Sequence, residues 1–459
     1  MNHKRLKRRL IVISLVSVIL FCGVGTVKAT DKPPIFDELV EAQAQAVAAN
    51  EALMQYFYGN GWVKEYPEYF SSCYIEDNVL HICLVSPTEQ EKAALDRVLE
   101  NYKDVIVYEY SQYSLSELME YADRAAKELQ KQGCKVTLWC VDSITGNIVI
   151  GVLPEDVQTA NVLINKQHVY ARGSTLPKIE IEASEYVVTG DDIREFVTED
   201  TVKATASSNQ TVIGGSTIMI DSQNRSAGTC GYYGGSKALI SCGHGTTVGA
   251  DVLMNGDRIG TVVKTQYAND GTGDYCIIAL DDSEISHKIG SSTNGYMVID
   301  GGTYHSPIVG TYITKYGYKT GYSYGTVSAT NVTINAGSSK TIYGMTQVSI
   351  SFGTGSIGGD SGGPYLAGGM FCGIHHGHVD NVPTTVFFTP YSVIYNGGFT
   401  AIGLHNCTSW TDIGPTNHSG YCIICQETVY EAHYEHWNSS TGRCIRCGRT
   451  DLINVPGTN

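Results

Sequence analysis

Residues 211–405 form the part of the chain whose sequence restricts the fold most. Glycine, threonine, serine, valine and tyrosine dominate this stretch, and short alternating runs are separated by turns that contain Gly or Asn. Alternation with a period of two is typical of β-strands that bury one face. Short strands at close intervals do not suit a helical or a parallel α/β fold. The stretch therefore predicts an all-β sandwich or barrel.

One turn in this stretch has the composition that a nucleophilic serine requires. Residues 359–364 read Gly-Asp-Ser-Gly-Gly-Pro. Glycines supply unusual backbone angles and room for a substrate, and N–H groups in such a turn can face the oxygen of the carbonyl under attack. We expect Ser361 to be the nucleophile. The backbone N–H groups of Gly359 and Ser361 are expected to form an oxyanion hole.

A candidate base and a candidate carboxylate precede this serine. The apolar run 238–241 leads through Cys242 and Gly243 to His244, and Asp274 stands just before the apolar run 275–280. A half-buried carboxylate is stable when it accepts a hydrogen bond from an imidazole, and such an imidazole can take the serine proton. His244 is the expected general base and Asp274 its orienter. Nearby acidic residues lie among polar or turn residues and are expected to face solvent: Asp251, Asp257, Asp270, Asp281 and Asp282.

The order His, Asp, Ser along the chain resembles that of the chymotrypsin-like serine proteases, and not that of subtilisins or α/β-hydrolases. The resemblance is closest to the secreted bacterial streptogrisin and alpha-lytic protease branch. Besides the triad it includes residues 259–263, 319–327 and 384–390. It implies two packed six-stranded barrels with the triad at their junction. It further implies a serine endopeptidase that hydrolyses protein or peptide substrates through an acyl-enzyme, with no cofactor for catalysis.

The same resemblance indicates which residues meet the substrate side chain. Trypsin-like relatives have an aspartate six residues before the serine, where this chain has Gly355. Glutamyl-specific relatives have a histidine where this chain has Phe388, so cleavage after large hydrophobic residues is favoured. Residues 375–378 lie on the expected substrate-pairing strand and read His-His-Gly-His. Imidazoles there would attract acidic residues, and this alternative stays open. The expected substrate-binding residues are Gly355, His375, His376, Gly377 and Phe388.

The N-terminal residues 1–29 have the composition of a secretory signal. Basic residues among the first ten precede the short apolar run 11–24, and Ala29 offers a small residue for cleavage. A run this short favours export over a retained membrane anchor, and no stable anchor is expected. The protein is therefore expected to be secreted. A formal charge of −15 and a pI of about 5.3 argue against a nucleic-acid partner.

Residues 30–205 predict an α+β unit. The sequence Ser-Pro-Thr-Glu at 86–89 indicates one helix start, because serine can cap, proline fits the first turn and glutamate can close a capping box. Apolar residues on one helical face from Leu115 to Leu129 predict a second helix. Strands are expected over 136–141 and 148–153.

This order of elements resembles the pro-regions of the same proteases. The resemblance implies a segment that templates folding of the protease and then occupies its cleft as an intramolecular inhibitor. Removal is expected in the small, polar linker 200–211. The alternative is an independent binding domain that the mature protein retains.

The chain contains 14 cysteines, which in an exported protein favours disulfides or metal sites over free thiols. Cys230 and Cys242 lie symmetrically about a Gly-Gly-Ser turn, so a hairpin would place them opposite each other, and a disulfide is expected. The related proteases usually have the second cysteine directly after the histidine, where this chain has Gly245. Cys73 and Cys83 flank a turn and could form a pair. Cys276 and Cys372 each lie in an apolar strand and are expected to be either buried thiols or a pair.

The tail after residue 405 differs from the rest of the chain. Two Cys-x-x-Cys motifs separated by 18 residues have the spacing of a tetrahedral zinc site. The expected ligands are Cys422, Cys425, Cys444 and Cys447. The segment resembles small zinc-ribbon-like modules appended to secreted bacterial proteins. Two disulfides are the competing interpretation.

The expected organisation is thus a multidomain precursor: signal 1–29, pro-region 30–205, chymotrypsin-like protease domain 206–405 and Cys-rich tail 406–459. The expected function is that of a secreted serine endopeptidase made as a zymogen. A non-catalytic, protease-like protein that binds a surface or polymer is the main alternative. An esterase that uses the same triad is another.

Overall fold

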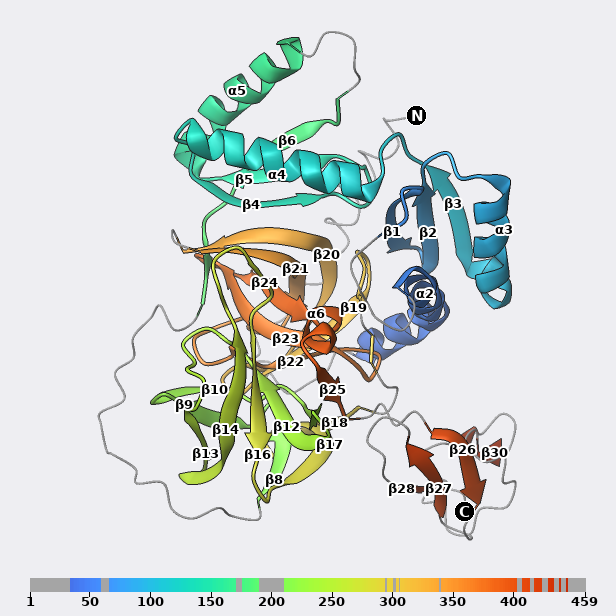
Figure 1. The fold of residues 1–459 in the computed structure, drawn as a ribbon, viewed down its shortest axis with the longest axis vertical. Coiled ribbons are helices and arrows are strands. Elements are labelled where there is room, and N and C mark those ends of the chain that lie inside the picture. The colour runs from blue at the N-terminus through green and yellow to red at the C-terminus, as the bar shows by residue number, and fades with distance from the viewer. Residues whose placement is uncertain are drawn as a thin grey trace.

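The computed structural model describes residues 34–58, 66–170, 176–189 and 210–402, apart from short gaps at 294, 300–302, 305 and 338–339. Beyond residue 406 it describes five short strands (Figure 1). They are β26 (Cys407–Asp412), β27 (Asn417–Cys422), β28 (Thr428–Ala432), β29 (Trp437–Asn438) and β30 (Arg443–Cys444). The predicted signal and most of the predicted linker lie outside the described residues.

The first half of the protease segment is an antiparallel sheet of eight strands, in the order β10-β9-β13-β14-β16-β12-β11-β25. Its strands are β9 (Thr217–Ile220), β10 (Gln223–Ser226), β11 (Cys230–Tyr233), β12 (Ser236–Ser241), β13 (Asp251–Met254), β14 (Asp257–Gln266), β16 (Tyr275–Leu280) and β25 (Phe399–Ala401). This sheet has two strands more than the six that the sequence predicts, and the C-terminal strand β25, which pairs with β11, is one of them.

The second half is a closed barrel of six antiparallel strands. The ring runs β21-β24-β23-β22-β19-β20 and closes where β20 pairs with β21, as predicted. Its strands are β19 (Tyr312–Gly317), β20 (Gly321–Ala336), β21 (Lys340–Phe352), β22 (Pro364–Ala367), β23 (Met370–Val379) and β24 (Val382–Pro390). Smaller elements lie beside the two halves: β8 (Thr211–Gly214), β15 (Gly271–Thr272), β17 (Glu284–Ser291), β18 (Gly295–Val298) and α6 (Tyr391–Asn396).

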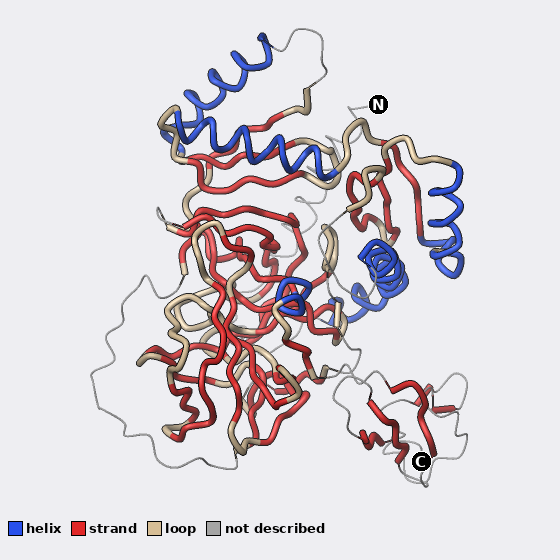
Figure 2. Tube along the Cα trace, viewed as in Figure 1, coloured by secondary structure: helices blue, strands red, loops and turns tan. Residues whose placement is uncertain are grey.

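The N-terminal segment is α+β, as its sequence predicts. Figure 2 shows that the long helices all belong to this segment, whereas the protease halves consist almost wholly of strands. Its first part contains α2 (Pro34–Tyr58), β1 (Phe70–Glu76), β2 (Val79–Leu84), α3 (Glu89–Val98), the 3₁₀ turn Glu100–Val105 and β3 (Ile106–Tyr110). Its second part contains α4 (Leu115–Lys131), β4 (Val136–Val141), β5 (Ile148–Val152), the 3₁₀ turn Pro154–Asp156, α5 (Val157–Tyr170), β6 (Ile179–Ala183) and β7 (Val187–Val188).

The two predicted helices form at the expected places, with one change of cap. Helix α4 begins with a capping box between Ser114 and Glu117. The N-cap of helix α3 is Thr88, two residues after the first residue of the predicted motif, and Glu91 closes the box. Ser86 has a φ of +43°, a left-handed conformation that does not lead into a helix. The sequence therefore predicted a capping box at the start of α3, but the N-cap is Thr88 and not Ser86.

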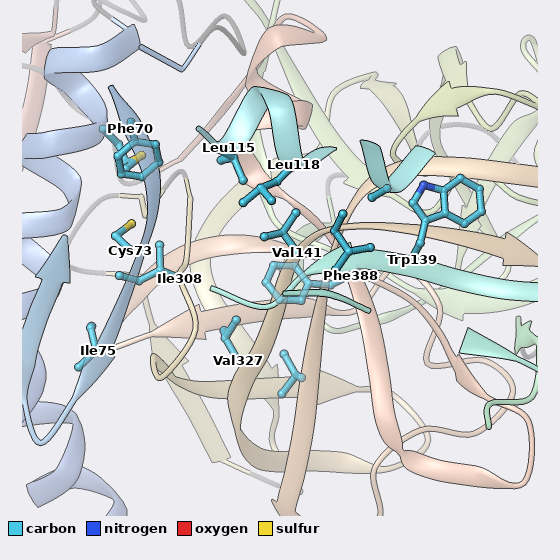
Figure 3. Packing of buried hydrophobic residues seen from close by; sticks show 14 of the residues in the cluster. Phe70, Cys73, Ile75, Leu115, Leu118, Trp139, Val141, Ile308, Val327 and Phe388 are labelled. Carbon is cyan, nitrogen blue, oxygen red and sulfur yellow. The ribbon is translucent and has the colours of Figure 1, made fainter. Parts of the chain in front are cut away.

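The N-terminal segment extends the second barrel. Strand β4 pairs antiparallel with β20, so that β4, β5 and β6 continue the barrel sheet outward. Trp139 and Val141 from β4 share one buried cluster with Val327 and Phe388 from the barrel (Figure 3). Burial of such side chains stabilises their contact by roughly 1.5–3 kcal/mol each. The two units therefore share one core.

The predicted disulfide between Cys230 and Cys242 is not formed. The hairpin register pairs Cys230 with Leu239, three residues before Cys242, so the two cysteines are not opposite each other. Both are buried free thiols. The pairing considered for Cys73 and Cys83 is likewise absent, because Cys73 is opposite Ile82 and the two thiols lie on opposite faces of the sheet. Cys276 and Cys372 are buried free thiols as well.

None of the helices in the described part of the chain combines the length and the apolar character needed to cross a lipid bilayer.

Candidate active site

His244 follows strand β12 on a turn that only glycine permits. A Cβ on Gly243 would lie 2.6 Å from the carbonyl oxygen of Tyr275 and 2.7 Å from that of Gln266. The fully buried Arg225 holds the far side of this turn. Its guanidinium donates to the carbonyl oxygens of His244, at 2.8 Å, and Gly245, at 3.2 Å. The backbone of the histidine is therefore fixed from two sides.

Asp274 immediately precedes strand β16 and is fully buried. Its backbone N–H donates to Thr389 Oγ1 at 2.9 Å, and the Thr389 hydroxyl donates back to the Asp274 carbonyl at 3.0 Å. Thr389 lies on β24, which belongs to the second barrel. These contacts attach the backbone of Asp274, which lies in the first half, to the second half of the protease segment.

The imidazole and the carboxylate meet as predicted. His244 Nδ1 lies 2.5 Å from Asp274 Oδ2, and the backbone N–H groups of Gly243 and His244 both donate to Oδ1 at 2.8 Å. Burial alone would lower the pKa of His244, but the charges of Asp274 and Cys242 and the hydrogen bonds to both together hold it well above its ordinary value. Burial would raise the pKa of Asp274, but the neighbouring imidazoles hold it well below its usual range. The carboxylate is thus ionised and able to stabilise an imidazolium.

Ser361 comes from the turn before β22 and is 2% exposed. Its hydroxyl lies 3.4 Å from the carbonyl oxygen of His376, and its own carbonyl oxygen accepts from Ser226 N at 3.0 Å. Ser226 ends β10 in the first half, so the turn with the serine is attached across the seam between the two halves. The structure therefore places the three predicted residues at this seam.

The predicted oxyanion-hole turn depends on Gly359. Its φ is +96°, and a Cβ there would lie 2.7 Å from the ring of Tyr318. The Ser226 hydroxyl donates to its carbonyl oxygen at 3.2 Å. Any larger residue would be strained and would displace the peptide that the hole requires.

Lys315 is a site residue that the sequence reasoning missed. Its fully buried ammonium donates to Asp360 Oδ2 at 2.8 Å, to the Gly355 carbonyl at 2.7 Å and to Thr320 Oγ1 at 3.1 Å. Asp360 precedes the nucleophile, so this ion pair holds the serine turn. The sequence feature that could have indicated this role is a single lysine within the buried strand Tyr312–Gly317, because lysine is almost never fully buried without a partner.

The predicted substrate residue His375 and the neighbouring His378 both contact Ser356, which was not predicted. His375 Nε2 lies 2.7 Å from Ser356 Oγ, and His378 Nδ1 lies 3.2 Å from the same oxygen. Two residues three apart on a regular strand would face opposite sides. A bulge in β23, between His375 and Gly377, changes the alternation and brings both imidazoles to one hydroxyl.

The other predicted substrate residues have supporting positions. Phe388 is fully buried and stacks on Tyr365, with ring centroids 4.4 Å apart. The Tyr365 hydroxyl lies 3.0 Å from His375 Nδ1. Gly355 accepts from Lys315, and a Cβ on Gly377 would lie 2.2 Å from the Val188 carbonyl of the N-terminal segment.

His376 does not join its neighbours in this group. Its Nδ1 lies 2.6 Å from Asp274 Oδ2, on the opposite side of β23 from Ser356. His376 was predicted at the substrate, and the structure places its side chain against Asp274 instead of Ser356.

One cluster of possible metal ligands lies within the described part of the chain. The ligand atoms of His244, Asp274 and His376 are within 4.8 Å of one another, and both imidazoles already contact Asp274. The predicted zinc ligands of the tail lie outside the described side chains. For Cys422 and Cys444 only the backbone is described, and Cys425 and Cys447 lie outside the described residues.

No family model matches the sequence. Glutamyl endopeptidase 2 of Streptomyces griseus is 32% identical over 174 residues, which cover 36% of this chain and 85% of that protein. Streptogrisin-A of the same organism is 27% identical over 262 residues, which cover 55% of this chain and 74% of that protein. A crystal structure of Cellulomonas bogoriensis chymotrypsin matches 42% of this chain and 99% of its own, with 25% identity and a TM-score of 0.36.

Proposed function

The chain belongs to the chymotrypsin-like bacterial serine proteases that include glutamyl endopeptidase 2 and streptogrisin-A, and from this premise we propose that it is the exported zymogen of an endopeptidase that cleaves after acidic residues. Hydrolysis of peptide bonds follows from the family. The residue assignments, the zymogen form, the export and the acidic preference are our proposals.

The proposed reaction uses the three residues at the seam. Ser361 Oγ attacks the carbonyl carbon, and His244 takes its proton and later gives it to the leaving amine. Asp274 keeps the imidazole oriented through Nδ1 and stabilises the imidazolium. The 2.5 Å contact and the ionised state of Asp274 support these roles. The N–H groups of Gly359 and Ser361 stabilise the oxyanion, and water then hydrolyses the acyl-enzyme.

The acidic preference rests on the group around Ser356. Burial, and next the charge of Lys315, hold the pKa of His375 well below its ordinary value, so the imidazole is neutral in the free enzyme. The pKa of Tyr365 lies well above its ordinary value because of burial, so its hydroxyl keeps its proton. If Tyr365 donates to His375 Nδ1, then Nε2–H points to Ser356. The Ser356 proton is then available for a substrate carboxylate.

A bound carboxylate would also favour a proton on His375, because an anion nearby stabilises the imidazolium. A large hydrophobic side chain would instead cover this polar group and offer no acceptor for the Ser356 proton. The observation that carries the acidic preference is therefore the contact of His375 and His378 with one buried hydroxyl. This contact favours cleavage after acidic residues, the alternative that the sequence left open. Cleavage after large hydrophobic residues is favoured less.

Replacing His375 by valine should lower kcat/KM about 10- to 100-fold for a peptide with Glu at the cleaved bond, because a hydrogen bond to a charged group is lost. Matched peptides with Gln or Phe at that position should change by less than about threefold. Steady-state kinetics on the processed enzyme measure both. The exposed His287 gives a matched control, His287→Val. A wild-type enzyme that prefers the Phe peptide, with His375→Val unchanged on Glu, would refute the acidic preference.

The inhibitory role of the N-terminal segment rests on strand β7. Val188 and Val187 pair antiparallel with His378 and Val379 of β23, the strand on which a substrate is expected to pair. Asp380 N donates to the Tyr186 carbonyl at 2.9 Å. A backbone that occupies this edge excludes a substrate backbone from it.

The segment has a second attachment that does not depend on the cleft. Phe36 of α2 is 6% exposed and packs in one buried cluster with Tyr324 of the second barrel, with ring centroids 4.8 Å apart. Gln43 of the same helix donates to the Gly310 carbonyl at 2.7 Å and accepts from Tyr312 N at 3.1 Å. Two separate attachments would keep β7 at the edge of β23 until the segment is degraded.

Replacing Val187 by aspartate should loosen this inhibition. Val187 is fully buried, and an unpaired carboxylate there opposes docking of β7. We expect the intact precursor to react with a fluorophosphonate probe at least about tenfold faster than wild type. Gel electrophoresis separates intact from processed chains. Val162→Asp, at a 48% exposed position of α5, serves as control. Equal labelling rates for all three precursors would contradict the inhibitory role.

A further inference from the structure

The carboxylate of Asp274 receives two imidazoles. His244 Nδ1 and His376 Nδ1 lie 2.5 and 2.6 Å from the same oxygen, Oδ2, while Oδ1 accepts two backbone N–H groups. The two rings stand perpendicular, with centroids 5.5 Å apart. His376 is fully buried. One acid therefore accepts from the proposed general base and from a second histidine.

The direction of this hydrogen bond follows from the state of the carboxylate. Asp274 is ionised, so it accepts, and Nδ1 of His376 must carry a hydrogen. Among the described residues, Nε2 of His376 has no hydrogen-bond partner and is buried. The contact with Asp274 is therefore the hydrogen bond that orients this imidazole.

We propose that His376 is a positioning residue for the triad: its side-chain N–H holds Oδ2 of Asp274 in line with His244 and takes up part of the carboxylate charge. This inference rests on the proposed function of His244, Asp274 and Ser361. The negative charge that His376 takes up does not stabilise the protonated form of His244. Without the His376 N–H, Asp274 stabilises the imidazolium of His244 more strongly, and less of the neutral general base is present.

Other charged or titratable groups face this pair, and none replaces the His376 N–H. In the first half of the protease segment, Arg225 donates to the carbonyl of His244 and to Cys242 Sγ. Cys276 is a second buried thiol in this half, and burial raises its pKa. Tyr267 presents its ring to both imidazoles, at 5.6 and 6.2 Å between centroids. On β23, His375 is turned toward Ser356. Among the described residues, the hydrogen bonds to the carboxylate oxygens of Asp274 come from His244, His376 and the N–H of Gly243.

Two substitutions at this position separate positioning from packing. Asparagine places its amide nitrogen two bonds from Cβ, as Nδ1 is, whereas the amide nitrogen of glutamine is one bond further along. His376→Asn therefore retains the donor to Asp274, and His376→Gln does not. The carbonyl oxygen of His376, which faces Ser361, is unchanged in both variants. His376→Leu removes the donor and fills the space.

The test measures kcat/KM against pH on processed enzyme whose active sites are titrated with a fluorophosphonate. His376→Leu and His376→Gln should lower kcat/KM about 10- to 100-fold, mainly through kcat, as expected for a lost hydrogen bond to a charged group. Their acid limbs should move to higher pH by roughly half a unit, because His244 holds its proton more strongly. His376→Asn should retain the wild-type limb and come within about threefold of wild-type kcat/KM.

Equal losses in Asn, Gln and Leu variants with an unmoved acid limb would overturn the proposal and leave His376 a packing residue. Wild-type activity in the Gln variant would overturn it too. If the Leu variant fails to fold, the comparison of Asn with Gln decides. A processed wild-type enzyme that the fluorophosphonate does not label would instead refute the proposed function itself.

Discussion

Replacing Ser361 by alanine should lower kcat/KM for peptide hydrolysis by about 10⁵- to 10⁶-fold. The change removes the only atom proposed to attack the carbonyl, while the contact between His244 and Asp274 does not involve it. The residual rate would come from binding and from the oxyanion hole. Progress curves with a fluorogenic peptide measure the loss.

The control for this variant is Ser349→Ala, since Ser349 is an exposed serine of strand β21. It should retain wild-type activity and fluorophosphonate labelling, whereas Ser361→Ala should lose both. Activity of Ser361→Ala within about tenfold of wild type would mean that another residue is the nucleophile. A precursor with Ser361→Ala that is still cleaved in the linker would show that maturation needs a second protease.

Replacing Lys315 by methionine should have the largest effect on stability. Lys315 and Asp360 form an ion pair in which both side chains have no exposed surface. Removing one partner leaves a buried, unpaired charge, which costs about 3–5 kcal/mol in the free energy of unfolding. Urea unfolding of the precursor measures the change, in a Ser361→Ala background so that self-digestion does not interfere. Activity should fall in the active background, because Asp360 fixes the serine turn.

Two further variants test the reason for that effect. Lys237→Met removes a lysine that is exposed, and should change stability by less than about 0.5 kcal/mol. Lys315→Met combined with Asp360→Asn removes both charges and should restore part of the loss. The ion pair is not the stabilising element if Lys315→Met costs no more than the exposed control.

The proposed maturation and the proposed specificity meet on one strand. His375, His376 and His378 of β23 contact Ser356 or Asp274, while the edge of the same strand pairs with β7. Release of β7 would therefore expose the edge next to residues that select the substrate and orient the acid. The intact precursor would keep both covered.

The sequence alone determined the chemistry that needs particular residue types in a particular order. The turn at 359–364, the glycine before His244 and the aspartate before an apolar strand each require their residues locally, so they could be recognised one by one. Capping boxes and strand alternation are local as well, and they predicted α3, α4, β4 and β5 to within a few residues.

Only the tertiary structure decided contacts between distant residues. Lys315 lies 45 residues from Asp360, and Asp274 lies 102 residues from His376. No local pattern relates such pairs, because closing the barrels brings them together. The bulge in β23 and the register of β11 with β12 are further examples: the extra residue in the bulge leaves His376 against Asp274 and not against Ser356, and a three-residue offset separates Cys230 from Cys242. Strand register depends on the packing of whole sheets, which local sequence does not specify.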